Sequence, residues 1–156
     1  MSGTSHRGAV DRGRHGQRVS SSTTGDCFRA AMSVILDVPN GDHLPTNDGE
    51  DDGGWWLDWH CFLRDLGLAI QNASAKGPIW KPHRWIASVA SKNYEGCTHA
   101  IVMEGHKVLF DPSPRRRYHA GWSLLGKECV VGGYWLEVAD VVRLDALRDF
   151  RQEHNR

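Results

Sequence analysis

The sequence predicts an α+β fold in which N-terminal helices pack on an antiparallel sheet. Two segments before residue 67 carry apolar residues at helical spacing, whereas the chain after residue 67 carries apolar runs of strand length separated by turn residues. Helices that precede a run of strands, instead of alternating with them, are typical of the α+β class. The 156 residues, of which 40% are apolar, are enough for one domain with its own core.

Residues 1–16 differ in composition from the rest of the chain. They are polar, rich in glycine and arginine, and without periodicity. Such a segment predicts a disordered N-terminal arm, followed by a single domain over residues 17–156. A basic arm that contacts an anionic partner is the alternative, but a solvated tail is the simpler interpretation.

The first predicted helix spans residues 27–36. Asp26 can cap its N-terminus, and Pro39 prevents it from continuing. Apolar residues recur at the i, i+3, i+4, i+7 and i+8 positions, namely Phe28, Ala31, Met32, Ile35 and Leu36. Only Arg29 and Ser33 leave a polar edge, so we expect this helix to be deeply buried.

The remaining elements follow from the same two periodicities. A second helix is predicted over residues 55–66, with Gly67 as its C-terminal stop. Five strands and a closing helix come next: Leu68–Asn72, Arg84–Val89, Thr98–Met103, Lys107–Asp111 and Glu128–Val138, then Leu144–Phe150. An acidic loop, residues 40–54, separates the first two helices. Its carboxylates do not have the spacing of an EF-hand, so a solvated loop is favoured over a calcium site.

The composition argues against several classes of function. Lys plus Arg equals Asp plus Glu, 19 each, so no overall charge points to nucleic acid or to a cationic partner. No apolar run approaches the length of a membrane span, and the N-terminus lacks the apolar region of a secretory signal. The chain is therefore predicted to be cytoplasmic. Its four cysteines, Cys27, Cys61, Cys97 and Cys129, are then expected to be free thiols.

Three residues from different elements suggest a catalytic site. Cys27 lies where a loop rich in glycine, serine and threonine becomes a helix, and a helix N-terminus favours the thiolate form of a cysteine. His99 lies near the start of one predicted strand and Asp111 at the end of the next, with a tight turn around Gly105 between them. Each residue alone has a packing explanation, but their order and their structural settings together favour chemistry.

The register of this predicted hairpin decides whether His99 and Asp111 can meet. A three-residue loop would pair Met103 with Lys107 and place His99 directly opposite Asp111. A two-residue loop would pair Glu104 with Lys107 and turn Asp111 to the other face of the sheet. The catalytic interpretation therefore requires the first register, or a bulge that restores it.

In the favourable register the three residues supply a complete reaction. His99 would take the proton of the Cys27 thiol and later protonate the leaving group, since imidazole titrates near neutrality. Asp111 would fix the tautomer of the imidazole and stabilise its cation. The Cys27 backbone N–H and the side-chain amide of Gln17 are the candidate donors to the oxyanion.

Three stretches of the sequence resemble one family. GDCFRAAMSVILDVP, THAIVMEGHKVLFDPSP and VVGGYWLEV are similar to the small papain-like cysteine peptidase proteins, relatives of the thiol hydrolases, that are common in bacteriophage and bacterial genomes. The similarity covers residues 17–138, and its most specific parts are the Gly-Asp-Cys helix start and the His-Ala…Asp-Pro-x-Pro hairpin. Two positions depart from the pattern: DPSP stands in place of DPHP, and Arg18 follows Gln17.

The resemblance implies a site and a function. It implies Cys27 as nucleophile, His99 as base, Asp111 as orienting carboxylate and Gln17 as oxyanion residue. The reaction it implies is hydrolysis of a peptide, isopeptide or other amide through a thioester, without a cofactor. The expected partner is an amide substrate, in the host cytoplasm if a phage encodes the chain, with no role for a membrane and none expected for nucleic acid.

Two other functions are compatible with the same residues. An acyltransferase of transglutaminase type would form the same thioester and pass it to an amine instead of water. A binding protein on the same scaffold would perform no chemistry, although the Cys, His and Asp together argue against it. A thiol that iodoacetamide modifies unusually fast at neutral pH would separate the enzymes from the binding protein.

Four tryptophans are candidates for contacts with substrate. Trp55, Trp56, Trp85 and Trp135 could line the cleft, although core packing is the safer interpretation for at least half of them. Cys97 is a candidate wall residue beside the same cleft.

The run Arg115–Arg117 and a group of cysteines are two further candidates. Arg115 and its neighbours could hold an acidic or phosphorylated substrate, and a solvated loop is an equally good interpretation. A zinc site on Cys97 and His99, completed by Cys61 or Cys27, is disfavoured because no Cys-x-x-Cys knuckle accompanies them. No metal site is therefore predicted.

Overall fold

The computed structural model describes residues 27–39, 41, 43–45, 54–74, 84–93, 95–113 and 115–155. Its helices and strands, in chain order, are α1 (Cys27–Leu36), α2 (Gly54–Asp65), β1 (Leu68–Ser74), β2 (Arg84–Ala90), β3 (Thr98–Glu104), β4 (Lys107–Phe110), β5 (Val130–Val138), η2 (Val141–Arg143) and α3 (Leu144–His154). The predicted N-terminal arm, the Asp26 cap and the acidic residues 46–53 lie outside the described residues. None of the described helices is long and apolar enough to cross a membrane.

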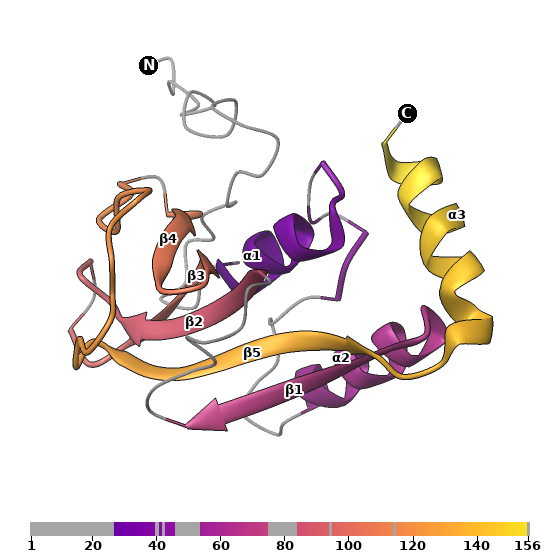
Figure 1. The fold of residues 1–156 in the computed structure, drawn as a ribbon, viewed down its shortest axis with the longest axis horizontal. Helices are drawn as coiled ribbons and strands as arrows, with labels where there is room; N and C mark the ends of the chain where they lie inside the picture. The colour runs from indigo at the N-terminus through magenta and orange to yellow at the C-terminus, as the bar shows by residue number, and fades with distance from the viewer. Residues whose placement is uncertain are drawn as a thin grey trace, which may run out of the picture.

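The five strands form one sheet in the order β1-β5-β2-β3-β4, and every neighbouring pair is antiparallel (Figure 1). The two N-terminal helices pack on this sheet, with α1 against β3 and β2 and α2 against β1. The predicted α+β class, with N-terminal helices on an antiparallel sheet, is therefore confirmed. The closing helix α3 is four residues longer than the sequence predicted.

One face of the sheet carries the helices. The burial expected for α1 is observed, since seven of its ten residues are buried, including Ser33, which donates to the Ala30 carbonyl at 2.7 Å. The residues that we call the helical-face cluster include Ala31, Met32, Leu36, Trp59, Leu63, Leu68, Ile70, Ile86, Ala100 and Val102. Burial of this apolar surface favours the packing of α1 and α2 on the sheet.

The other face of the sheet packs under the chain that follows β4. The residues that we call the loop-face cluster are Trp85, Ala87, Val89, Ile101, Met103, Val108, Tyr118, Leu124 and Val130. Trp85 is completely buried here, and its indole N–H donates to the Gly105 carbonyl at 2.7 Å. Trp85 is thus a core residue, which was the alternative to a cleft wall that the sequence left open. Strand parity placed it with Ala87 and Val89 but could not say that the long loop covers that face.

The C-terminal helix α3 is tied to the end of α1. The Arg151 guanidinium donates through Nε to the Leu36 carbonyl at 2.8 Å, and Asn155 donates to the Asp37 carbonyl at 2.8 Å. These bonds satisfy carbonyls at the C-terminus of α1 that have no partner within the helix. The rings of Phe62 and Phe150 meet edge to face at 5.5 Å and join α3 to α2.

Candidate active site

Cys27 is the first residue of α1 and is half-buried. It packs against the helical-face cluster beside Phe28, whose ring is buried among those of Trp56, Trp59 and Tyr134. This packing fixes the N-terminus of the helix over β3. The positive end of the α1 dipole therefore lies at the Cys27 thiol.

The β3–β4 hairpin has a two-residue turn, and a bulge corrects its register. Glu104 pairs with Lys107 and Met103 with Val108, but Val102 pairs with Phe110, so Leu109 is the extra residue on β4. The side chains agree with this pairing. Val108 belongs to the loop-face cluster, whereas both Leu109 and Phe110 pack against the helical-face cluster.

The bulge brings Asp111 to the face of the sheet that His99 occupies. His99 has the same strand parity as Ile101 and Met103, which belong to the loop-face cluster. Because Leu109 and Phe110 use two positions on the helical side, Asp111 turns back to the loop side. Of the two registers considered from the sequence, the structure thus has the two-residue turn together with the bulge that restores the contact.

His99 and Asp111 form a short hydrogen bond. Nε2 of His99 lies 2.7 Å from Oδ1 of Asp111, and their side chains are only 12% and 1% exposed. A neutral imidazole with its proton on Nε2 donates to the carboxylate and keeps Nδ1 as an acceptor. His99 also makes a side-chain hydrogen bond with Cys27, and Nδ1 is the ring nitrogen that the bond with Asp111 does not use. The structure therefore brings Cys27, His99 and Asp111 together in the order that a thiol, its base and an orienting carboxylate require.

Asp111 is also held by backbone donors from the loop that follows it. Oδ1 accepts the N–H of Ser113 at 2.8 Å, and Oδ2 accepts the N–H of Tyr118 at 3.0 Å. Burial by itself would raise the pKa of Asp111. The hydrogen bonds from His99, Tyr118 and Ser113 outweigh it, so the pKa lies below its usual value of 3.8 and the carboxylate stays charged.

The charge on Asp111 and the contact with Cys27 both favour the cationic form of His99. Burial by itself would lower the pKa of His99, but the hydrogen bonds with Asp111 and Cys27 outweigh it and raise the pKa from 6.5 to about 9. At neutral pH the imidazole is therefore in its protonated, cationic form next to the Cys27 side chain.

The other predicted site residues lie in different environments. Gln17 and the side chain of Trp55 lie outside the described residues. Trp56 is half-buried, and its ring packs 6.3 Å from that of Phe28, the residue after Cys27. Trp135 is half-buried and donates to Oε1 of Glu137 at 3.0 Å. Cys97 is exposed in the connection that leads into β3, and Arg115 is exposed in the loop after Asp111.

The donors that hold Asp111 were not found from the sequence. Ser113 and Tyr118 act through their backbone N–H groups, which every residue except proline carries, so no side-chain signal marks them. Asp before Pro indicated only the end of a strand.

In the described part of the chain, no group of three or more His, Cys, Asp or Glu could hold a metal ion. The prediction that the chain has no metal site is not tested further.

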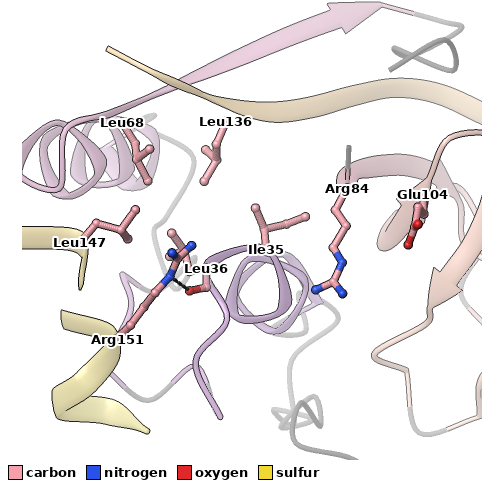
Figure 2. Close-up of a pocket in the computed structure, with 8 residues that line it drawn as sticks. All are labelled: Ile35, Leu36, Leu68, Arg84, Glu104, Leu136, Leu147 and Arg151. Carbon is pink, nitrogen blue, oxygen red and sulfur yellow. Dashed lines mark hydrogen bonds between the residues drawn. The ribbon is translucent and has the colours of Figure 1, made fainter. Parts of the chain in front are cut away.

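A pocket of about 420 Å³ lies away from this site (Figure 2). Ile35 and Leu36 of α1 face Leu68 and Leu136 of the sheet across it, and Glu104 lies at its rim. Glu104 is five residues further along β3 than His99, a distance of about 17 Å in a strand. The pocket therefore belongs to the opposite end of α1 from the Cys27 thiol.

The site stands without support from similar proteins. No family model matches the sequence, and neither a curated protein nor a solved structure is significantly similar to the chain.

Proposed function

We propose that this chain is a cysteine-dependent amide hydrolase with a papain-like arrangement of helix and sheet, and that Cys27, His99 and Asp111 are its catalytic residues. The observation that carries the proposal is the 2.7 Å hydrogen bond between His99 and Asp111, made by a ring that also contacts the Cys27 thiol. A histidine that serves only packing needs no buried carboxylate on one side and a thiol on the other.

The first half of the reaction forms a thioester. The sulfur of Cys27, as thiolate, attacks the substrate carbonyl carbon, and a C–S bond forms while the carbonyl π pair moves to oxygen. When the tetrahedral intermediate collapses, the C–N bond breaks and the amine leaves with the proton of the His99 imidazolium. Asp111, held by Ser113 and Tyr118, keeps Nδ1 of His99 directed at the reacting atoms.

The second half releases the acid. Neutral His99 takes a proton from water, the hydroxide attacks the thioester carbonyl, and the C–S bond breaks to return the Cys27 thiolate and the imidazolium. The oxyanion of both halves lies at the N-terminus of α1, where the dipole of the helix and the Cys27 N–H favour negative charge. Gln17 is the proposed second donor, as the resemblance implies.

The substrate class that we propose is a peptide, isopeptide or related amide. The test incubates wild type and Cys27→Ala with a panel of such amides in ¹⁸O-labelled water and follows the products by mass spectrometry. We expect wild type to form an acyl adduct on Cys27 and to release a carboxylic acid that carries one ¹⁸O. Cys27→Ala should form neither, although alanine should leave the helix folded.

Other results of the same experiment would assign a different function. Transfer of the acyl group to an added amine, without ¹⁸O in the product, would show an acyltransferase of transglutaminase type. Equal behaviour of wild type and Cys27→Ala across the panel, with no adduct on any cysteine, would contradict the proposal and favour a binding protein.

A further inference from the structure

The loop after β4 is anchored to the carboxylate of the proposed site at both of its ends. Ser113 donates its N–H to Oδ1 of Asp111, and Tyr118 donates its N–H to Oδ2 of the same group. Between these two anchors lie three consecutive arginines, Arg115, Arg116 and Arg117, which we call the arginine loop.

Further contacts fix the arginine loop in place. The N–H of Arg116 donates to the Ser113 carbonyl at 3.0 Å, and its guanidinium stacks 5.4 Å from the centre of the Phe110 ring. Ser113 is buried, and its hydroxyl accepts a hydrogen bond from Asn93 at 3.1 Å. Asn93 also accepts from Nε of Arg117, more weakly, at 3.4 Å. The arginine loop is therefore held in one position by its contacts with the β2–β3 connection and with Asp111.

The chain length between the anchors limits how far the arginines lie from the proposed site. Each arginine is at most two residues from Ser113 or Tyr118, which is about 8 Å between Cα atoms. Both anchors touch the carboxylate that His99 contacts at 2.7 Å. The guanidinium groups, on flexible stems, can therefore reach a chain that is bound across Cys27.

The charges at this end of the molecule do not balance. The segments 91–97 and 112–118 carry four cations, the arginine loop and Lys92, and a single carboxylate, Glu95. Lys92 lies over the rings of Tyr118 and Trp122, at 4.5 Å and 5.1 Å from their centres, on the same side of the sheet as the loop. The whole chain is neutral by formal charge, so this excess is local and not a consequence of the overall charge.

We propose that the arginine loop selects acidic substrates, namely peptides with Asp or Glu side chains within a few residues of the amide that Cys27 attacks. This inference rests on the proposed function and narrows its substrate class. Guanidinium groups bind carboxylates through paired N–H donors, and a local positive potential raises the concentration and the association rate of anionic chains. An arginine run that served only solubility would need no attachment to Asp111.

The first test measures the potential at Cys27 directly and needs no substrate. Iodoacetate and iodoacetamide differ in one negative charge and little in size. We therefore compare their alkylation rates at Cys27 at about 10 mM salt, where the Debye length is about 30 Å. Removing two cations of the arginine loop should lower the iodoacetate to iodoacetamide ratio about threefold in Arg115→Gln/Arg117→Gln. The difference should disappear at high salt.

Two controls make the comparison specific. Arg148→Gln removes the same kind of charge from α3, where Arg148 pairs with Asp145 at 3.1 Å, and should leave the ratio at Cys27 unchanged. Cys61 on α2 should show no change in either variant. Arg115→Gln alone gives the same test with half of the effect if the double variant does not fold. An unchanged ratio at Cys27 in a folded double variant overturns the proposal.

The second test uses pairs of peptide substrates that differ only by Glu in place of Gln beside the scissile amide. We expect kcat/KM of wild type to favour the acidic peptide about tenfold at low salt, and the preference to collapse in Arg115→Gln/Arg117→Gln but not in Arg148→Gln. Turnover of both peptides without preference would overturn the acidic selection and leave the hydrolase intact. If no peptide is turned over, the hydrolase fails, and the alkylation ratio alone decides the role of the loop.

Discussion

The carboxylate of Asp111 has several hydrogen-bond donors that depend on it. Its carboxylate is almost completely buried and accepts hydrogen bonds from His99, Ser113 and Tyr118. In Asp111→Asn one of the two oxygens becomes an amide nitrogen, which cannot accept, so at least one of these buried donors loses its partner. We expect the free energy of unfolding to fall by about 1–3 kcal/mol and turnover to fall less than in His99→Ala. Asp145→Asn, on the exposed surface of α3, is the matched control.

Urea unfolding of both variants checks this expectation. A stability of Asp111→Asn equal to that of Asp145→Asn would show that the three donors contribute nothing to Asp111 in solution.

The raised pKa of His99 predicts how stability depends on pH. The pKa of His99 is about 9 in the folded chain, whereas the usual value of a histidine is 6.5. The folded state therefore binds the proton more tightly than the unfolded state does. The resulting stabilisation, about 3 kcal/mol, is complete below pH 6.5 and is lost as the pH rises through 9. Asp111 has the opposite sign, since its lowered pKa gives stability that is lost as the pH falls below 3.8.

Denaturant unfolding of wild type and His99→Gln between pH 6 and pH 10 measures the His99 contribution. The difference in unfolding free energy between the two chains should shrink as the pH rises. A difference that stays constant over this range would mean that His99 does not gain a proton on folding.

At the scale of the element, the β4 bulge decides whether the proposed site exists. Inserting one alanine between Phe110 and Asp111 shifts Asp111 by one strand position and should turn its side chain to the helical side of the sheet. Leu109→Ala shortens the side chain of the extra residue but keeps the register. We expect the pKa of His99 to return toward 6.5 in the insertion variant and to stay near 9 in Leu109→Ala.

Titration of the imidazole signals by NMR distinguishes these two variants. A His99 pKa near 9 in a folded insertion variant would show that the register set by the bulge is not what brings His99 and Asp111 together.

The sequence predicted the elements of this fold better than their relative placement. The limits of α1 follow from apolar spacing and from Pro39, which are local signals, and the structure confirms residues 27–36. The hairpin register was left open because a bulge has no glycine or other local mark here, and Leu109 looks like any strand residue. Trp85 was left open between core and cleft for a related reason, since Tyr118 and Leu124 of the same cluster lie more than thirty positions later in the chain.

In the molecule as a whole, the sheet lies between two apolar clusters, and the proposed site combines residues from both sides of the sheet. Cys27 packs with the helical-face cluster, whereas His99 and Asp111 are on the strand parity of the loop-face cluster. The site therefore needs α1, the hairpin and the following loop at once. No short piece of the chain contains it.

A substitution at Gly67, between α2 and β1, tests whether the proposed site depends on the other end of the molecule. Gly67 has φ +76°, and its carbonyl accepts from Ala139 and Asp140, which leads the chain into η2. A Cβ there would lie 2.6 Å from the Asp140 carbonyl oxygen, so Gly67→Ala should destabilise the fold by about 1–3 kcal/mol. The rate of Cys27 alkylation per folded molecule should not change. A parallel loss of stability and of Cys27 reactivity would show that the two ends are coupled.

If the proposed site is correct, the fold activates one thiol of the four cysteines. The most direct measurement is the rate at which iodoacetamide modifies each cysteine near neutral pH, in wild type and in His99→Ala, with the sites resolved by mass spectrometry. We predict that Cys27 reacts faster than Cys61, Cys97 and Cys129 in wild type, and that His99→Ala lowers the rate at Cys27 at least about tenfold while the other three rates stay constant. Faster labelling of Cys97 or Cys61, or a Cys27 rate that does not depend on His99, would contradict the account.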